Sequence, residues 1–157
     1  MKVGNNHLLA LCVAVLVVLC VASVSTPLYF NHQRQQREAL VKEHLRAIRR
    51  AETAYLRAHG TYCGDLQQLV GEGRLADSMQ YVPWSGGRKF SISTTVSENG
   101  DRPIPLMECS AMASDYLRGL NPGRVADFIQ QANASGSFPG LKFGDITTPN
   151  NNAGNWE

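Results

Sequence analysis

Charge is nearly absent from the first 30 residues of this chain. No charged residue occurs between Leu8 and Phe30, and of the 15 basic and 13 acidic residues only Lys2 lies within the first 30 positions. The rest of the sequence therefore carries a nearly equal number of basic and acidic side chains. A nucleic-acid-binding protein needs a surplus of positive charge to displace counterions from phosphates. The balance predicts that nucleic acid is not a partner.

The sequence also lacks the residue patterns of catalytic and metal centres. His44 and His59, which fall in one predicted helix, are separated by about four helical turns and cannot share a metal ion. The four cysteines form no Cys-x-x-Cys pair, and the serines, aspartates and glycines form no nucleophile motif or phosphate loop. We therefore expect no catalytic residue, metal, cofactor or small-molecule substrate, and we expect that the protein is not an enzyme.

The N-terminal segment has the length and polarity of a membrane anchor. A helix needs about 20 apolar residues to cross the hydrocarbon core of a bilayer. Residues 8–30 supply them, and Tyr29 and Phe30 suit the aromatic belt at a membrane surface. We predict a short tail over residues 1–7, a transmembrane anchor over residues 8–30 and a single head domain over residues 31–157. The lipid bilayer is then the first predicted partner.

Two other fates of this segment are compatible with the sequence. Lys2, an apolar core and the small residues Ser23 and Ser25 also fit a cleavable signal peptide. A lipoprotein would use Cys20, but Leu19 stands where a small residue is needed. The anchor is favoured by the length of the apolar stretch and by the helical pattern that continues beyond it.

The orientation of the anchor rests on opposing signals. Basic residues follow the span, which by the positive-inside rule favours a cytoplasmic head. A short tail with little charge can nevertheless stay in the cytoplasm, and Cys63 and Cys109, the head's two cysteines, can form a disulfide in an oxidising compartment. We predict a cytoplasmic N-terminus, a periplasmic head and a Cys63–Cys109 disulfide. The alternative for the cysteines is a pair of buried free thiols.

Residues 33–59 are predicted to form one long amphipathic helix. Apolar residues recur at spacings of three, four and seven, and Gly60 is a suitable stop signal. The stripe consists of Val41, Leu45, Ile48 and Tyr55. The anchor and this helix are expected to form one nearly continuous helix, with a bend at Pro27 and Asn31. Ala10, Ala14 and Ala22 are candidate contacts with other transmembrane helices, because small residues permit close helix packing.

The remaining head residues predict short helices and a small antiparallel sheet. Asp65 is a candidate helix cap, and Asn121-Pro122 opens a second helix. A strand is expected over residues 90–96, a turn at Asn99-Gly100, and a return strand at Ile104–Leu106 that its prolines place at a sheet edge. A third short strand is expected near residues 141–146, and residues 147–157 form a polar tail. The predicted fold class is α+β, with the long helix packed on the sheet.

Trp156 stands out in the polar tail. A tryptophan in an Asn-rich segment either docks on its own domain or serves a partner. We therefore include Trp156 among the candidate partner contacts.

The stretch Ile48–Leu69 resembles type IV pilins and the pseudopilins of secretion systems. Its helix ends at an aromatic residue, a glycine and a second tyrosine, followed by a short turn with leucines. The resemblance covers about residues 8–110 and implies a pilin-like head. The chain departs from the family in two places, because Gly4 is followed by Asn5 rather than phenylalanine and no acidic residue precedes Glu38.

The chain is also similar to a group of uncharacterised single-pass envelope proteins of Bacteroidota. The similar stretches cover most of the chain, and the closing segment is the most specific of them. They are Arg37–Tyr62, Tyr81–Pro83 with Phe90, Pro139–Gly144 and Asn151–Glu157. This resemblance implies a protein of the bacterial inner membrane whose partners are other inner-membrane subunits, namely proton-channel proteins of the ExbB and ExbD kind that energise TonB.

Three hypotheses follow. The first is a non-enzymatic accessory or scaffold subunit of an envelope complex. The second is a pseudopilin-like component of a secretion or pilus system. The third is a secreted binding domain that is released by cleavage near Ser25.

Overall fold

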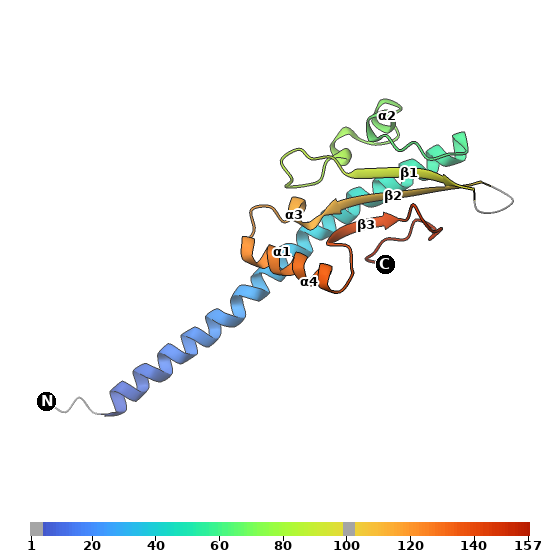
Figure 1. The fold of residues 1–157 in the computed structure, drawn as a ribbon. Coiled ribbons are helices and arrows are strands. Elements are labelled where there is room, and N and C mark those ends of the chain that lie inside the picture. The colour runs from blue at the N-terminus through green and yellow to red at the C-terminus, as the bar shows by residue number, and fades with distance from the viewer. Residues whose placement is uncertain (1–4, 99–102) are drawn as a thin grey trace. The chain divides into compact units, whose positions relative to one another are not determined.

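The computed structural model describes residues 5–98 and 103–157 (Figure 1). The chain divides into two compact units, Met1–Gln35 and Gln36–Glu157. The described residues of the first unit, 5–35, are helical, and the second unit contains the rest of that helix, a sheet and several short helices. The class is α+β, in agreement with the sequence.

Helix α1 (Asn5–His59) is assigned without interruption, and Pro27 lies inside it. Its apolar part is long enough to cross a membrane, and none of the side chains in that stretch is buried. The helix ends where the sequence predicts, because Gly60 adopts a φ of 78° and donates its N–H to the carbonyl of Leu56. The predicted bend at Pro27 and Asn31 does not interrupt the helix.

Three antiparallel strands form the sheet in the order β1-β2-β3. Strands β1 (Ser91–Ser97) and β3 (Gly140–Gly144) lie within one or two residues of the two strands predicted there, which confirms those predictions. Between them lies β2 (Ile104–Met112), which is longer than the predicted return strand. The predicted Asn99-Gly100 turn lies outside the described residues.

The prediction that the return strand is an edge strand was wrong, because β2 is the central strand. The proline within it, Pro105, nevertheless lies where β2 is paired on one side only, as in an edge strand. Pro105 pairs with Val96 of β1, whereas the pairing with β3 begins only at Glu108. The proline therefore lies where β2 has a single neighbour, so its missing N–H disrupts no ladder on the other side.

Short helices surround the sheet, and local signals explain most of them. Asp65 caps α2 (Leu66–Gly71) by accepting a hydrogen bond from the Gln67 backbone N–H. Asn121 caps α4 (Pro122–Ala134) in the same way, with proline at the first turn as predicted. The others are η1 (Asp77–Gln80) and α3 (Ala113–Tyr116).

The core of the second unit lies between α1 and the sheet. Val41, Leu45 and Ile48 are fully buried, as the apolar stripe predicts. They share one cluster with buried side chains of the strands, including Met107 of β2 and Phe143 of β3. Figure 1 shows α1 running behind the sheet over this part of its length. Burial of such side chains is the main favourable term for this unit, at about 1.5 to 3 kcal/mol each.

Candidate functional site: an arginine-lined groove

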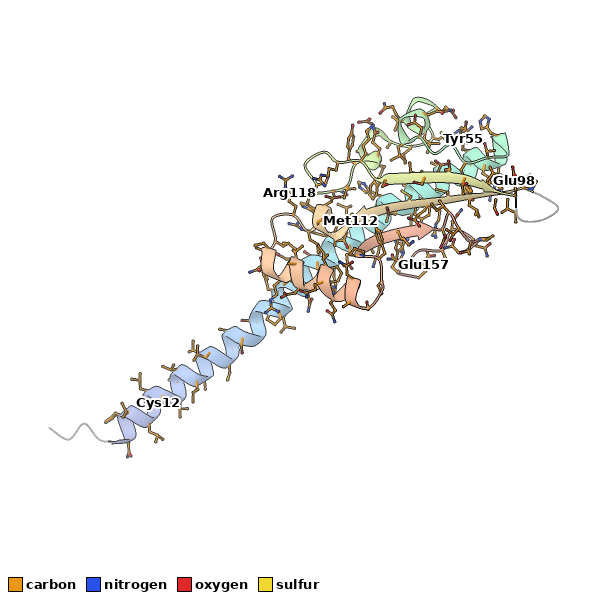
Figure 2. The ribbon with its side chains drawn as sticks, in the orientation of Figure 1. Cys12, Tyr55, Glu98, Met112, Arg118 and Glu157 are labelled. Carbon is orange, nitrogen blue, oxygen red and sulfur yellow. The ribbon has the colours of Figure 1, made fainter. Side chains whose placement is uncertain are left out.

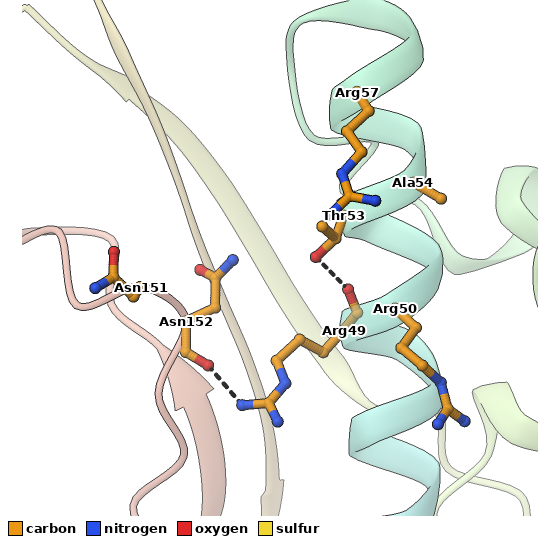
Figure 3. Close-up of a pocket in the computed structure, with 7 residues that line it drawn as sticks. All are labelled: Arg49, Arg50, Thr53, Ala54, Arg57, Asn151 and Asn152. Atoms are coloured by element: carbon orange, nitrogen blue, oxygen red, sulfur yellow. Dashed lines mark hydrogen bonds between the residues drawn. The ribbon is translucent and has the colours of Figure 1, made fainter.

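The second unit carries an open groove of about 420 Å³ along the C-terminal part of α1 (Figure 3). Three of its side chains are arginines from α1, and two are asparagines from the segment after β3. The lining consists of Arg49, Arg50, Thr53, Ala54, Arg57, Asn151 and Asn152. No carboxylate belongs to this lining, so the groove is positively charged.

Helical spacing places the arginines in the groove. Arg49, Thr53 and Arg57 follow one another at intervals of four, and Arg50 precedes Arg57 by seven, so all lie along one side of α1. The Thr53 hydroxyl donates a hydrogen bond of 2.7 Å to the carbonyl oxygen of Arg49 (Figure 3). With its proton held by the helix backbone, this hydroxyl is arranged as a structural group rather than as a nucleophile beside a base.

Arg49 is fixed by the C-terminal segment. It donates a hydrogen bond of 3.0 Å to the carbonyl oxygen of Asn152 and two more, of 3.1 and 2.8 Å, to the carboxylate of Glu157. The two bonds from Arg49 to the carboxylate and one from the backbone N–H of Gly154 lower the pKa of Glu157 to about 2. Bidentate geometry of this kind is the strongest form of arginine–carboxylate pairing.

The asparagines enter the groove on a tight turn. Asn151 and Asn152 both have a φ of 56°, and the N–H of Ala153 donates to the carbonyl of Asn150. Two successive residues with positive φ are characteristic of a type I′ turn, which asparagine tolerates better than other non-glycine residues. The Asn152 amide also donates a hydrogen bond of 2.7 Å to the Tyr62 hydroxyl, which fixes the turn beside α1.

Arg50 and Arg57 complete the cationic lining. Both side chains are exposed, and neither makes a hydrogen bond or an ion pair with any described residue. Two guanidinium groups in an open groove are suited to binding carboxylates or phosphates. Among the residues that the structure describes, no group of three or more His, Cys, Asp or Glu side chains is arranged to hold a metal ion.

The three alanines predicted as helix contacts are exposed on the first part of α1. Ala10 and Ala14 are one turn apart and share a side of the helix, whereas Ala22 lies about 80° around the axis from Ala14. The helix therefore brings two of the three candidates together. Their contact with a partner helix stays a prediction.

Trp156 docks on its own domain. The side chain is partly buried, packs against the core cluster and lies on Gly154, where a Cβ atom would collide with the indole ring. The indole Nε1 is buried and makes no hydrogen bond to the described residues. The structure therefore shows Trp156 docked on its own domain, which is one of the two roles that the sequence leaves open. Its contact with a partner stays a prediction.

The structure does not form the predicted Cys63–Cys109 disulfide. Both residues are free thiols. The Cys63 sulfur lies 3.4 Å from the carbonyl oxygen of Asp65, in the loop before α2, whereas Cys109 is fully buried in the central strand. Burial raises the pKa of both thiols, which favours their protonated, less nucleophilic form. The alternative of free thiols is what the structure contains.

Glu52 was missed as a special residue by the sequence analysis. It is fully buried, and its carboxylate accepts hydrogen bonds of 2.8 and 3.0 Å from the backbone N–H groups of Cys63 and Gly64. Burial raises its pKa, and the two N–H bonds oppose that rise. A sequence signal existed, because Glu52 follows Ile48 by four residues and so continues the apolar stripe.

No protein-family model, curated protein or solved structure matches this chain.

Proposed function

We propose that this protein is a non-enzymatic, single-pass subunit of an envelope complex, anchored in the inner membrane with its head in the periplasm. The observation that carries the proposal is the exposed apolar part of α1. Leu9, Val18 and Val21 expose 69%, 66% and 63% of their surface, and no described residue covers them. An apolar surface of this extent needs lipid or partner helices around it.

The head supports a binding role through its groove. Arg49 already holds one carboxylate, that of Glu157, while Arg50 and Arg57 are exposed beside it. An acidic segment of a partner subunit is the ligand that this chemistry suits best. The partners we propose first are proton-channel proteins of the ExbB and ExbD kind, because the resemblance to the Bacteroidota envelope proteins implies them.

Carbonate extraction and intact-mass measurement test the anchor. We expect the full-length chain to stay in the membrane pellet after carbonate treatment. Mature protein that begins near Thr26 and washes off the membrane would overturn the proposal in favour of a secreted domain. Trimming within the first ten residues would instead favour the pseudopilin-like alternative, for which the long helix and the antiparallel sheet are the supporting features.

Co-purification in mild detergent tests the complex. We expect the tagged chain to recover ExbB- and ExbD-type subunits when it is produced together with them. The double charge reversal Arg50→Glu and Arg57→Glu should reduce that recovery several-fold, whereas Arg124→Glu, on the exposed part of α4, should not. A chain that elutes alone as a monomer in the presence of these subunits would contradict the proposal.

A further inference from the structure

Trp84 is the one exposed aromatic side chain among the described residues of the second unit, with 44% of its surface accessible. It lies in the loop between η1 and β1 and has a φ of 59°. A bulky residue in this left-handed region costs about 1 to 2 kcal/mol. Backbone strain of this kind is concentrated at functional positions. The loop therefore holds a large apolar side chain at the surface in a strained conformation.

Hydrogen bonds fix this loop in place. The Ser85 hydroxyl is buried. It donates a hydrogen bond of 2.7 Å to the carbonyl of Val82 and accepts one of 2.9 Å from the backbone N–H of Arg88. Arg118 donates a further bond of 3.2 Å to the carbonyl of Ser85. Because these contacts flank Trp84 directly, its exposure is imposed by an ordered turn rather than by a loose one.

One arginine lies over the indole ring, and a second is bonded to the residue that follows Trp84. The guanidinium carbon of Arg37 lies 4.8 Å from the ring centroid of Trp84, and the same group donates bonds of 3.0 and 2.8 Å to the carbonyls of Tyr116 and Arg118. Arg118 is exposed (Figure 2). We call Trp84, Arg37 and Arg118 the Trp84 patch.

Asp115, three residues before Arg118, carries a carboxylate that already has a partner. Asp115 is paired with Arg88 at 2.8 Å, and the Arg88 side chain is 69% exposed. The surface around Trp84 is therefore cationic with an aromatic centre. This is the composition that proteins place at the boundary between a bilayer and water.

A short stretch of chain joins this patch to the predicted span. Arg37 follows Phe30, the last residue of the predicted span, by seven positions. Seven residues reach at most about 25 Å even when fully extended. This stretch of chain allows the patch to reach the headgroup layer.

We infer that the Trp84 patch docks on the membrane that holds the anchor. Trp84 enters the headgroup region, Arg118 binds the phosphates of anionic phospholipids, and Arg37 supports the ring from behind. Tryptophan and arginine both favour this layer, and each basic residue near an anionic surface adds to the attraction. The inference rests on the proposed anchoring, which the experiment below checks separately.

The two tryptophans of the chain provide the test. Trp156→Phe leaves Trp84 as the only indole, and Trp84→Phe leaves Trp156 as the matched control. The full-length variants are reconstituted into vesicles of phosphatidylcholine and phosphatidylglycerol, with or without lipids brominated near the headgroup. We expect bromine to quench the emission of Trp84 at least twofold and to leave that of Trp156 nearly unchanged.

Flotation of the same vesicles separates the two claims. Chains that do not float with lipid would overturn the anchoring and the inference together. Chains that float but show no greater quenching of Trp84 than of Trp156 would overturn the inference alone. Arg118→Gln in the Trp156→Phe background adds a milder test, since it should weaken the quenching, whereas Arg124→Gln should not.

Discussion

The carboxylate of Glu157 is held by the guanidinium of Arg49, 108 residues earlier in the chain, through two hydrogen bonds. This pair joins the segment after β3 to α1 and places Trp156 on the core between them. It also marks one end of the arginine-lined groove. The same contact therefore fixes the fold of the closing segment and holds a carboxylate beside the groove.

The Arg49–Glu157 pair predicts an acid-dependent loosening of this segment. The pKa of Glu157 is lowered from its ordinary value of 4.5 to about 2, so the pair's contribution is present above pH 4.5 and is lost as the pH falls toward 2. In the Trp84→Phe variant, Trp156 emission should shift to the red in that window. Glu157→Gln should remove this transition, although Asp145, whose pKa is also lowered to about 2, is retained. An identical titration in both variants would contradict the assignment.

Glu52 predicts a pH dependence of the opposite sign. Burial raises its folded pKa above the ordinary 4.5, so the stability linked to it is greatest below that value and is lost as the pH rises through the folded pKa. Glu52→Gln should flatten this part of the stability profile in urea unfolding, whereas Glu43→Gln, at an exposed position of the same helix, should leave it unchanged. A profile that Glu52→Gln does not alter would argue against the buried carboxylate.

Truncation of Glu52 should be much more costly than its neutralisation. Glu52→Ala leaves the backbone N–H groups of Cys63 and Gly64 without their acceptor. Each N–H group left unsatisfied away from water costs about 1 to 3 kcal/mol, so for two groups we expect a total loss of roughly 2 to 6 kcal/mol in the free energy of unfolding. Chemical denaturation of the wild type and Glu52→Ala at one pH measures it.

The cysteines predict a simple thiol count. Without reductant, the denatured chain should react at all four cysteines, because Cys63 and Cys109 are free in the structure. In the folded chain, burial should protect Cys109 from alkylation until the domain unfolds, whereas the half-buried Cys63 should react slowly. A count of two in the denatured chain would restore the disulfide that the sequence predicted.

Gly144 and Gly136 form a matched pair for a test of packing. Both adopt positive φ values, 76° and 69°, so alanine at either position carries a backbone cost of about 1 to 2 kcal/mol. At Gly144 the added methyl group would also collide with the Met107 carbonyl, whereas it meets nothing at Gly136. We expect Gly144→Ala to cost about 1 to 3 kcal/mol more than Gly136→Ala. Equal midpoints in thermal unfolding would contradict the close approach of β3 to β2.

Local signals in the sequence predicted the beginnings and ends of several elements correctly. The Asp65 cap, the Asn121-Pro122 start and the Gly60 stop each involve groups within about four residues of one another. Interactions over such short separations are nearly independent of the rest of the fold. Prediction failed at β2, because the number of neighbours of a strand depends on a segment about 35 residues further along the chain.

The sequence by itself determined that residues 8–30 form an uncharged segment able to cross a membrane and that an amphipathic helix follows it. Hydrophobicity and helical periodicity depend only on the order of residues. Only the tertiary structure decided that Glu52 is buried, that Arg49 holds Glu157, that the two head cysteines are free and that Trp84 lies over Arg37. Those relationships join residues from 11 to 108 positions apart, and they follow from how the sheet packs on the helix rather than from any local pattern.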